Sequence, residues 1–163
     1  MVAQNIAFAV LALTMVGAGF RLVTTKNVVR AALFLAIVLG GVAGIFILLA
    51  AEFVAWVQVL VYIGAIVVLL LFGVMLTRAP IGQEGDLDND QRWVGGLVAL
   101  FLLGALVAVL SDAFGRQKVT ITGVQRAAAV SDSIFGTYVV PFEVASVLLL
   151  AALVGAVALA RRD

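Results

Sequence analysis

The chain has 163 residues, of which 65% are hydrophobic and 12% charged, and its formal net charge is +1. With a mean hydropathy of +1.27, this composition is typical of an integral membrane protein and excludes an ordinary soluble domain. The near-neutral charge excludes a basic nucleic-acid-binding surface. The absence of Cys and His excludes disulfides, iron–sulfur clusters, haem ligation and the common zinc sites in this chain.

Five uncharged runs are long enough to cross a membrane, because about 20 helical residues span a hydrocarbon layer of roughly 30 Å. The sequence therefore predicts an all-α integral membrane protein with five transmembrane helices in one membrane domain, residues 1–163. The first run has no basic residue before it and is followed by Arg21, so we interpret it as a retained helix and not as a signal peptide. The expected spans are about 2–20, 31–51, 53–77, 93–110 and 137–160.

The Lys and Arg residues of the connections predict the orientation, because cytoplasmic connections carry an excess of both. Seven of them fall on one side of the membrane and three on the other. We therefore expect the N-terminus outside and the C-terminus in the cytoplasm. The seven are Arg21, Lys26, Arg30, Arg78, Arg92, Arg161 and Arg162, and the three are Arg116, Lys118 and Arg126.

Two connections are long and polar. The cytoplasmic connection 78–92 carries an acidic run between Gly and Pro residues. We interpret it as a solvated turn, because a calcium loop needs a better ligand spacing. The external connection 111–136 alternates polar and apolar residues at 118–122, which predicts a small hairpin on the outer surface.

The third span is the strongest candidate for function, because it places Gln58, Tyr62 and Gly64 near the middle of 25 uncharged residues. Gln58 and Tyr62 are four residues apart, so a regular helix would present them on one face. A buried amide and phenol in lipid need partners in other helices or in ordered water. They either form interhelical hydrogen bonds, each contributing about 0.6 to 2 kcal/mol, or line a hydrated path in a helix that changes shape.

Glycines in the second and third spans have two interpretations. Gly64 costs its helix roughly 1 kcal/mol relative to Ala. It either lets another helix approach closely or marks a local irregularity such as a π-bulge, which tends to occur at functional sites. Gly40 and Gly44 form a GxxxG pattern, which indicates helix packing.

Two carboxylates lie at the ends of spans. We expect Glu52 to reach the outer interface where the third helix begins. Glu143 follows Pro141, and we expect both in the first turn of the fifth helix, where Pro fits and the helix dipole favours an acid. No charged residue lies near the middle of a span, whereas a chain that moves protons alone is expected to carry one. The chain is therefore predicted to be part of a larger assembly.

Three segments resemble subunit J of bacterial NADH:quinone oxidoreductase, respiratory complex I, whose family includes subunit 6 of the mitochondrial enzyme. The third span, AEFVAWVQVLVYIGAIVVLLLFGVMLT, and the end of the chain, GTYVVPFEVASVLLLAALVGAVALARRD, carry the specific resemblance. The second span, NVVRAALFLAIVLGGVAGIFILL, is also similar. With five spans in the same order, the resemblance covers nearly the whole chain.

The resemblance implies a non-catalytic core membrane subunit of the proton-translocating enzyme, in the inner (plasma) membrane of a bacterial cell. It implies that this chain binds no cofactor and no metal and holds no catalytic residue. NADH, FMN, iron–sulfur clusters and quinone are expected in partner subunits. The expected partners are the quinone-site subunit, small neighbouring subunits and antiporter-like subunits.

The resemblance also implies a site in the third span. The third helix of this family can hold a π-bulge near a Tyr–x–Gly element, and its conversion to regular helix is expected to open or close a hydrated proton connection. Some relatives carry a carboxylate near Gln58, and because an amide does not titrate, this helix is not expected to hold a relayed proton. The expected hinge residues are Tyr62, Gly64 and Ala65, and their apolar neighbours are Val59, Val61 and Ile66.

Two alternatives remain open. The first is an accessory subunit of a related antiporter or membrane-bound hydrogenase complex, which the accompanying cofactors would distinguish. The second is a small independent oligomeric transporter. That alternative predicts activity of the chain expressed alone and a charged residue facing the centre of the bundle, and the sequence contains no such residue.

Overall fold

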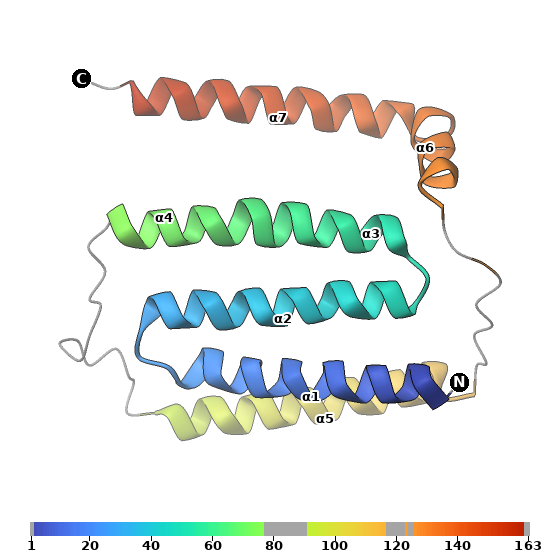
Figure 1. Ribbon diagram of the computed structural model, residues 1–163. Helices are drawn as coiled ribbons and strands as arrows, with labels where there is room; N and C mark the ends of the chain where they lie inside the picture. The colour runs from blue at the N-terminus through green and yellow to red at the C-terminus, as the bar shows by residue number, and fades with distance from the viewer. Residues whose placement is uncertain (1, 77–90, 117–122, 124–125, 162–163) are drawn as a thin grey trace.

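The computed structural model describes residues 2–76, 91–116, 123 and 126–161 (Figure 1). All regular structure in these residues is helical, and five helices are long and apolar enough to cross a membrane. The prediction of an all-α membrane protein with five spans is therefore confirmed. The spans are α1 (Val2–Thr24), α2 (Val28–Leu48), the third span made of α3 (Glu52–Val57), η1 (Gln58–Val67) and α4 (Val68–Leu76), α5 (Arg92–Phe114) and α7 (Val139–Ala160).

Successive crossings place the two ends of the chain on opposite sides of the bundle (Figure 1). The N-terminus lies on the side of the α2–α3 turn. The C-terminus lies on the side of the α1–α2 connection. This arrangement agrees with an odd number of crossings, and which side is cytoplasmic stays a prediction.

The helices continue past the charged residues that limited the expected spans. α1 includes Arg21 and α5 includes Asp112. α2 begins earlier than expected, at Val28, because the side-chain oxygen of Asn27 accepts a hydrogen bond of 3.0 Å from the backbone N–H of Arg30. Charged side chains near helix ends reach the headgroup region, so a charge does not end a membrane helix.

A tight turn joins α2 to the third span. Ala50 adopts a left-handed conformation with φ of 59°, and the backbone N–H of Ala51 donates to the carbonyl of Phe46 at 2.9 Å. The left-handed conformation costs a non-glycine residue roughly 1 to 2 kcal/mol, and the hydrogen bond satisfies a carbonyl at the end of α2. The turn makes the two spans antiparallel neighbours. It also places Glu52 in the first turn of α3, where the helix dipole favours a carboxylate.

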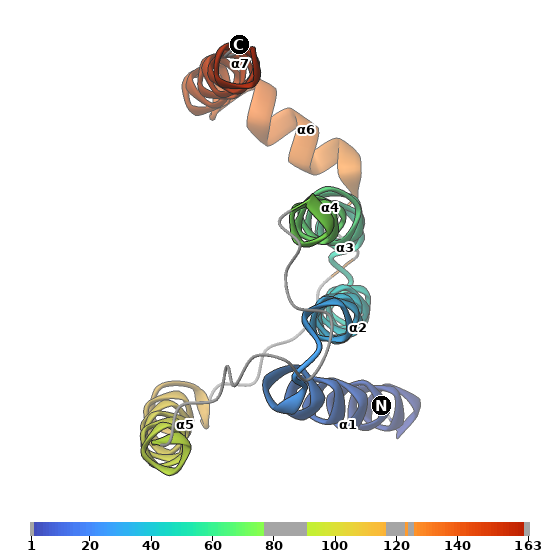
Figure 2. The same ribbon diagram turned by 90° about the vertical axis from the view of Figure 1, so that its left-hand side faces the viewer.

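Helices α1, α2 and the third span form one packed layer with α2 in its middle (Figures 1 and 2). The buried apolar residues of this layer are mostly alanines, among them Ala18, Ala32, Ala43 and Ala55. Small residues let helix backbones approach closely, which is the main source of helix association in lipid. The core of the described chain therefore lies along the two faces of α2, one in contact with α1 and the other with the third span.

The glycines of α2 divide between these two faces. A Cβ on Gly41 would overlap the side chain of Met15, and one on Gly44 would lie 3.0 Å from a leucine of α1. A Cβ on Gly40 would instead lie 3.8 Å from Cδ1 of Ile63 in the third span. The GxxxG pair thus serves two interfaces, and Gly41 and Gly44 form the contact with α1.

Spans α5 and α7 stand apart from this layer (Figure 2). None of the side chains that the structure describes in these two helices is buried. α7 contacts the short helix α6 (Ala127–Phe135), where the rings of Phe135 and Phe142 meet edge to face with centroids 5.1 Å apart. α6 also contacts α3, so it connects α7 to the packed layer. An isolated span is permitted in lipid because a helix satisfies its own backbone hydrogen bonds.

The connections differ in part from expectation. The connection between α5 and α7 contains the helix α6, which was not expected from the sequence, and the expected hairpin at 118–122 lies outside the described residues. Most of the acidic connection, residues 77–90, also lies outside them. α7 begins at Val139, so Pro141 is its third residue and Glu143 falls beyond the first turn. The placement of Glu143 in the first turn was therefore wrong.

Candidate functional site in the third span

A π-helical segment interrupts the third span. Residues Gln58–Val67 form η1, with α3 before it and α4 after it. A π-helix bonds residue i to residue i+5, is rare, and occurs frequently at functional sites. The irregularity that the resemblance implied near Tyr62 and Gly64 is present in the structure, and η1 contains all six residues expected in the hinge and beside it. Their role stays a prediction.

The spacing of the residues that contact α2 shows that the third span contains one residue more than a regular helix would. Ala55, Gln58, Val67 and Val74 are buried, and Ile63 contacts α2 at Gly40. The steps between contacts are three residues from Ala55 to Gln58, five to Ile63 and four to Val67. Regular helices place every third or fourth residue on one face. The five-residue step therefore lies where η1 accommodates one residue more than an α-helix would.

Gln58 is the one buried polar residue among those that the structure describes, with 8% of its surface exposed. Its Nε2 donates a long hydrogen bond of 3.5 Å to the carbonyl oxygen of Leu39 in α2. The predicted interhelical hydrogen bond is thus present for this residue. Tyr62 is 46% exposed, so the common face expected for the two is wrong in this conformation. The π-turn places Ile63 against α2 where Tyr62 would lie in a regular helix.

Among the described residues, no other helix places an atom close to Gly64. A Cβ added to it would meet only the carbonyl oxygen of Val59, at an ordinary contact distance of 3.6 Å. Val59 precedes Gly64 by five residues, which is the spacing of π-helical hydrogen bonds. Of the two interpretations of Gly64, the structure favours the local irregularity over close packing within this chain.

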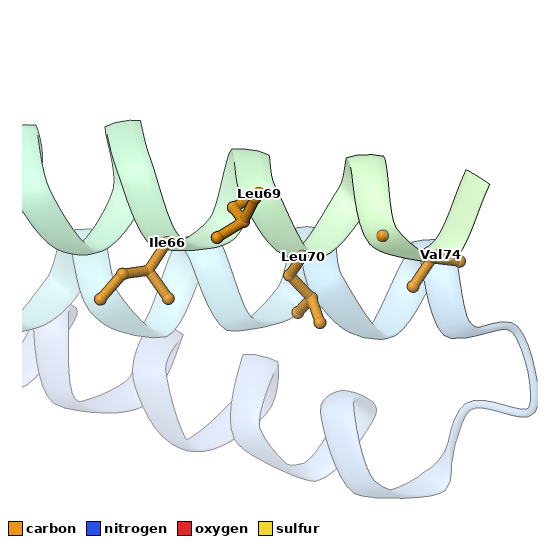
Figure 3. A pocket seen from close by; sticks show the side chains of 5 residues that line it. Ile66, Leu69, Leu70 and Val74 are labelled. Atoms are coloured by element: carbon orange, nitrogen blue, oxygen red, sulfur yellow. The ribbon is translucent and has the colours of Figure 1, made fainter. Parts of the chain in front are cut away.

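An apolar groove follows η1 along the third span (Figure 3). Its volume is about 480 Å³. Figure 3 shows the side chains of Ile66, Leu70 and Val74 following one another along one side of the span. Ile66 is 49% exposed and Leu70 42%, so both are available for contact with something outside the described residues. The lining residues are Ile66, Leu69, Leu70, Gly73 and Val74.

The two membrane carboxylates lie on different spans that do not contact each other. Glu52 is exposed and borders a cavity of about 350 Å³ beside Trp56 and Val59, at the α2–α3 end of the layer. Glu143 is exposed on α7. In the described part of the chain no three His, Cys, Asp or Glu residues gather as metal ligands. The arrangement of the described residues therefore centres on a helix irregularity with a buried amide.

Comparison with known proteins identifies the family. The family model described as NADH-ubiquinone/plastoquinone oxidoreductase chain 6 matches residues 18–159, which include the end of α1 and nearly all of the remaining spans. The chain is 38% identical to NAD(P)H-quinone oxidoreductase chain 6 of Synechocystis, over 98% of this chain and 82% of that protein.

Two further relatives come from different complexes. The chain is 41% identical to F(420)H(2) dehydrogenase subunit J of Methanosarcina mazei, over 98% of this chain and 92% of that protein. It is 37% identical to NADH-quinone oxidoreductase subunit J of Rhodobacter capsulatus, over 96% of this chain and 81% of that protein. Five apolar spans and these similarities agree: the chain is a multi-pass membrane protein and belongs to the chain 6 (subunit J) family of NADH-quinone oxidoreductases.

Proposed function

We propose that this chain is a core membrane subunit of a proton-translocating NADH:quinone oxidoreductase in a bacterial inner membrane, and that it couples quinone reduction to proton pumping. Family membership supports the assignment to the complex. The absence of Cys and His supports a subunit without a redox centre. NADH, FMN, iron–sulfur clusters and quinone bind to partner subunits, which include the quinone-site subunit, small neighbours and antiporter-like subunits.

The unburied spans support the proposal that other chains surround this one. α5 and α7 present apolar residues on every side, and none of their described side chains is buried. A subunit that acted alone would be expected to close its spans around a polar path. Partner helices beside α5 and α7 fit an arrangement in which this chain lies between larger subunits.

The π-helical segment is the observation that carries the coupling role. If η1 becomes regular helix while α3 keeps its contacts, the part of the span after it rotates by roughly 100°, the angle of one residue. Each residue now facing α2 is then replaced by the residue before it. Tyr62 takes the place of Ile63, and Ile66 takes the place of Val67.

The exchange changes the polarity of the interface at Gly40. With η1 in place, Ile63 lies against Gly40 and the contact is apolar. After conversion the hydroxyl of Tyr62 enters the same contact, next to the amide of Gln58 on the preceding turn. The missing side chain of Gly40 leaves room for the larger ring. Two polar groups in an apolar interface provide partners for water, so the two helix forms differ in whether a hydrated connection is possible.

The other residues that would turn toward α2 after conversion now line the groove along α4. Ile66, Leu70 and Gly73 border it now and would face α2 after conversion. All of them are apolar or small, and lipid or neighbouring chains solvate them as well as α2 does. The exchange therefore carries no large hydrophobic cost. Suppose that the ratio of the π-helical form to the regular form changes from 1:99 to 99:1. The free-energy difference between the two forms must then change by about 5.5 kcal/mol between the two states of the quinone site.

Replacing Gly64 with Val tests the proposal. A β-branched residue restricts the backbone that must change its hydrogen bonding. We expect quinone reduction and proton pumping to fall together in membrane vesicles, while NADH oxidation with an artificial electron acceptor stays normal. The control is Gly17→Val in α1, where a Cβ also meets no atom of another helix. Normal pumping in the Gly64 variant would contradict the proposed hinge.

A second candidate function follows from the relative in Methanosarcina mazei, which is a subunit of an F(420)H(2) dehydrogenase. The same membrane subunit would then serve a complex that takes electrons from another donor; a related antiporter or membrane-bound hydrogenase complex is the same kind of alternative. Purification in mild detergent, followed by absorbance spectra for flavin and iron–sulfur clusters and by assays with NADH, NADPH and reduced F420, distinguishes them. NADH oxidation by that preparation supports the first function.

A further inference from the structure

A cavity of about 580 Å³ lies between the end of α1 and the beginning of α5, remote from η1. The two helix ends lie on the same side of the bundle (Figure 1). One part of the wall is polar and the remainder is apolar or small. The residues of the wall that matter here are Phe20, Thr24, Lys26, Gly95, Gly96 and Ala99.

We propose that this cavity binds an anionic phospholipid, with its phosphate at Lys26 and an acyl chain against the beginning of α5. The position fits a lipid, because the cavity lies where the spans leave the membrane and extends along the apolar part of α5. A lipid headgroup and an acyl chain need this combination of one polar end and one apolar groove.

Charge favours an anionic headgroup over a zwitterionic one. Among the described residues of the wall, Lys26 is the one that carries a charge. Arg21 and Arg30 lie outside the wall, and an acidic run at 84–90 precedes α5 in the sequence. Basic residues at the membrane surface attract anionic lipids by about 1 kcal/mol each. Lys26 lines the cavity itself, and an ammonium group with three donors can bind a phosphate while keeping another partner. The hydroxyl of Thr24 already donates to the carbonyl of Phe20 at 2.8 Å, so Lys26 supplies the specific contact.

The glycines of α5 favour an acyl chain in the groove. A Cβ on Gly95 or Gly96 would meet no atom within 4 Å, so no side chain of the described residues fills this space. An unfilled groove beside lipid loses van der Waals contact along its whole wall. A flexible acyl chain fills an irregular groove of this kind against the bare backbone, whereas the described residues supply no side chain to occupy it.

Photolabelling of the whole complex in lipid nanodiscs tests the proposal. Two phospholipids carry the same diazirine acyl chain, one with a phosphatidylglycerol and one with a phosphatidylcholine headgroup, and mass spectrometry locates the label. We expect label within residues 20–26 and 95–99. The anionic lipid should exceed the zwitterionic lipid about fivefold, the effect of one basic residue at the membrane surface.

Matched variants separate the headgroup from the acyl chain. Lys26→Gln should abolish the preference for the anionic lipid, whereas Arg21→Gln removes the same charge outside the cavity wall and should retain most of it. Gly96→Leu should fill the groove and remove the label from both lipids. Gly104→Leu is its control, because Gly104 lies on α5 outside the cavity and a Cβ there also meets no atom. If Gly96→Leu prevents assembly, Gly95→Leu replaces it.

Three outcomes would overturn the proposal. Equal labelling by the two lipids would remove the role of Lys26. Labelling that Gly96→Leu leaves unchanged would place the lipid elsewhere. A photoreactive residue at position 96 that links to another protein chain would show that a partner helix occupies the cavity. Assembly and NADH oxidation are measured in every variant, so that loss of the complex is distinguished from loss of the lipid.

Discussion

Deleting Gly64 tests whether the π-helix η1 is needed for function or only for packing. The deletion shortens the interval from Gln58 to Val67 from nine residues to eight, which a regular α-helix accommodates as two steps of four. Val67 and Val74, which are 3% and 8% exposed, then still face α2. The deletion therefore removes the extra residue and leaves both contact faces of the span in place.

The expected magnitudes differ sharply between assembly and coupling. Removing a glycine from a helix relieves a cost of about 1 kcal/mol, so the stability of the complex should stay equal or rise slightly. The switch, in contrast, loses one of its two forms. In the unmodified chain, a free-energy change of about 5.5 kcal/mol shifts the ratio of the two helix forms from 1:99 to 99:1. In the deletion variant no such change can restore the π-helical form, because its extra residue is gone. We expect pumping coupled to quinone reduction to fall to background.

The assay compares three quantities in the same vesicles: the amount of assembled complex, NADH oxidation with an artificial acceptor, and the proton gradient formed during quinone reduction. Deleting Leu69 is the control, because it removes a residue from the regular helix α4 and rotates Val74 away from α2 by roughly 100°. That control should reduce assembly itself. Wild-type pumping by the Gly64 deletion would refute the reasoning, and η1 would then be a packing feature only.

Three further substitutions test separate contacts. Gly41→Leu overlaps Met15 at the α1–α2 interface, and overpacking of this kind typically costs about 1 to 3 kcal/mol, so the yield and thermal stability of the complex should fall. Gln58→Leu removes one long hydrogen bond to Leu39, which contributes roughly 0.6 kcal/mol, so assembly should hardly change. Tyr62→Phe keeps the ring and removes the hydroxyl, so we expect fewer protons pumped per quinone reduced at normal assembly.

For each of these three predictions, one outcome would contradict the expected result. Gly17→Leu, a substitution on α1 where a Cβ meets no other helix, should leave stability unchanged, and equal losses in both glycine variants would count against the proposed contact. Loss of assembly in the Gln58 variant would mean that its amide holds more than the bond to α2. An unchanged proton stoichiometry in the Tyr62 variant would exclude the phenol hydroxyl from the hydrated connection.

The number and type of the spans were predictable because they are local properties. A run of about 20 apolar residues must form a helix in lipid, since only a helix satisfies its backbone within one segment. Helix ends were predicted less well. Asn27 starts α2 before Arg30, and α1 continues beyond Arg21, because side chains at the interface cap helices or reach the headgroups. Helix α6 was missed because its run Ala127–Phe135 is short and lies in a polar connection.

The position of the π-helix was expected from the resemblance around Tyr62 and Gly64, and no periodicity in the third span indicated it. The sequence alone determined that this chain is a five-span membrane protein without Cys or His, because composition and run length decide those properties. Only the tertiary structure decided that Ile63, and not Tyr62, lies against Gly40. The reason is physical: lipid and neighbouring helices are equally apolar, so a membrane span carries little sequence contrast between its outer and inner faces, and packing alone selects the residues that touch.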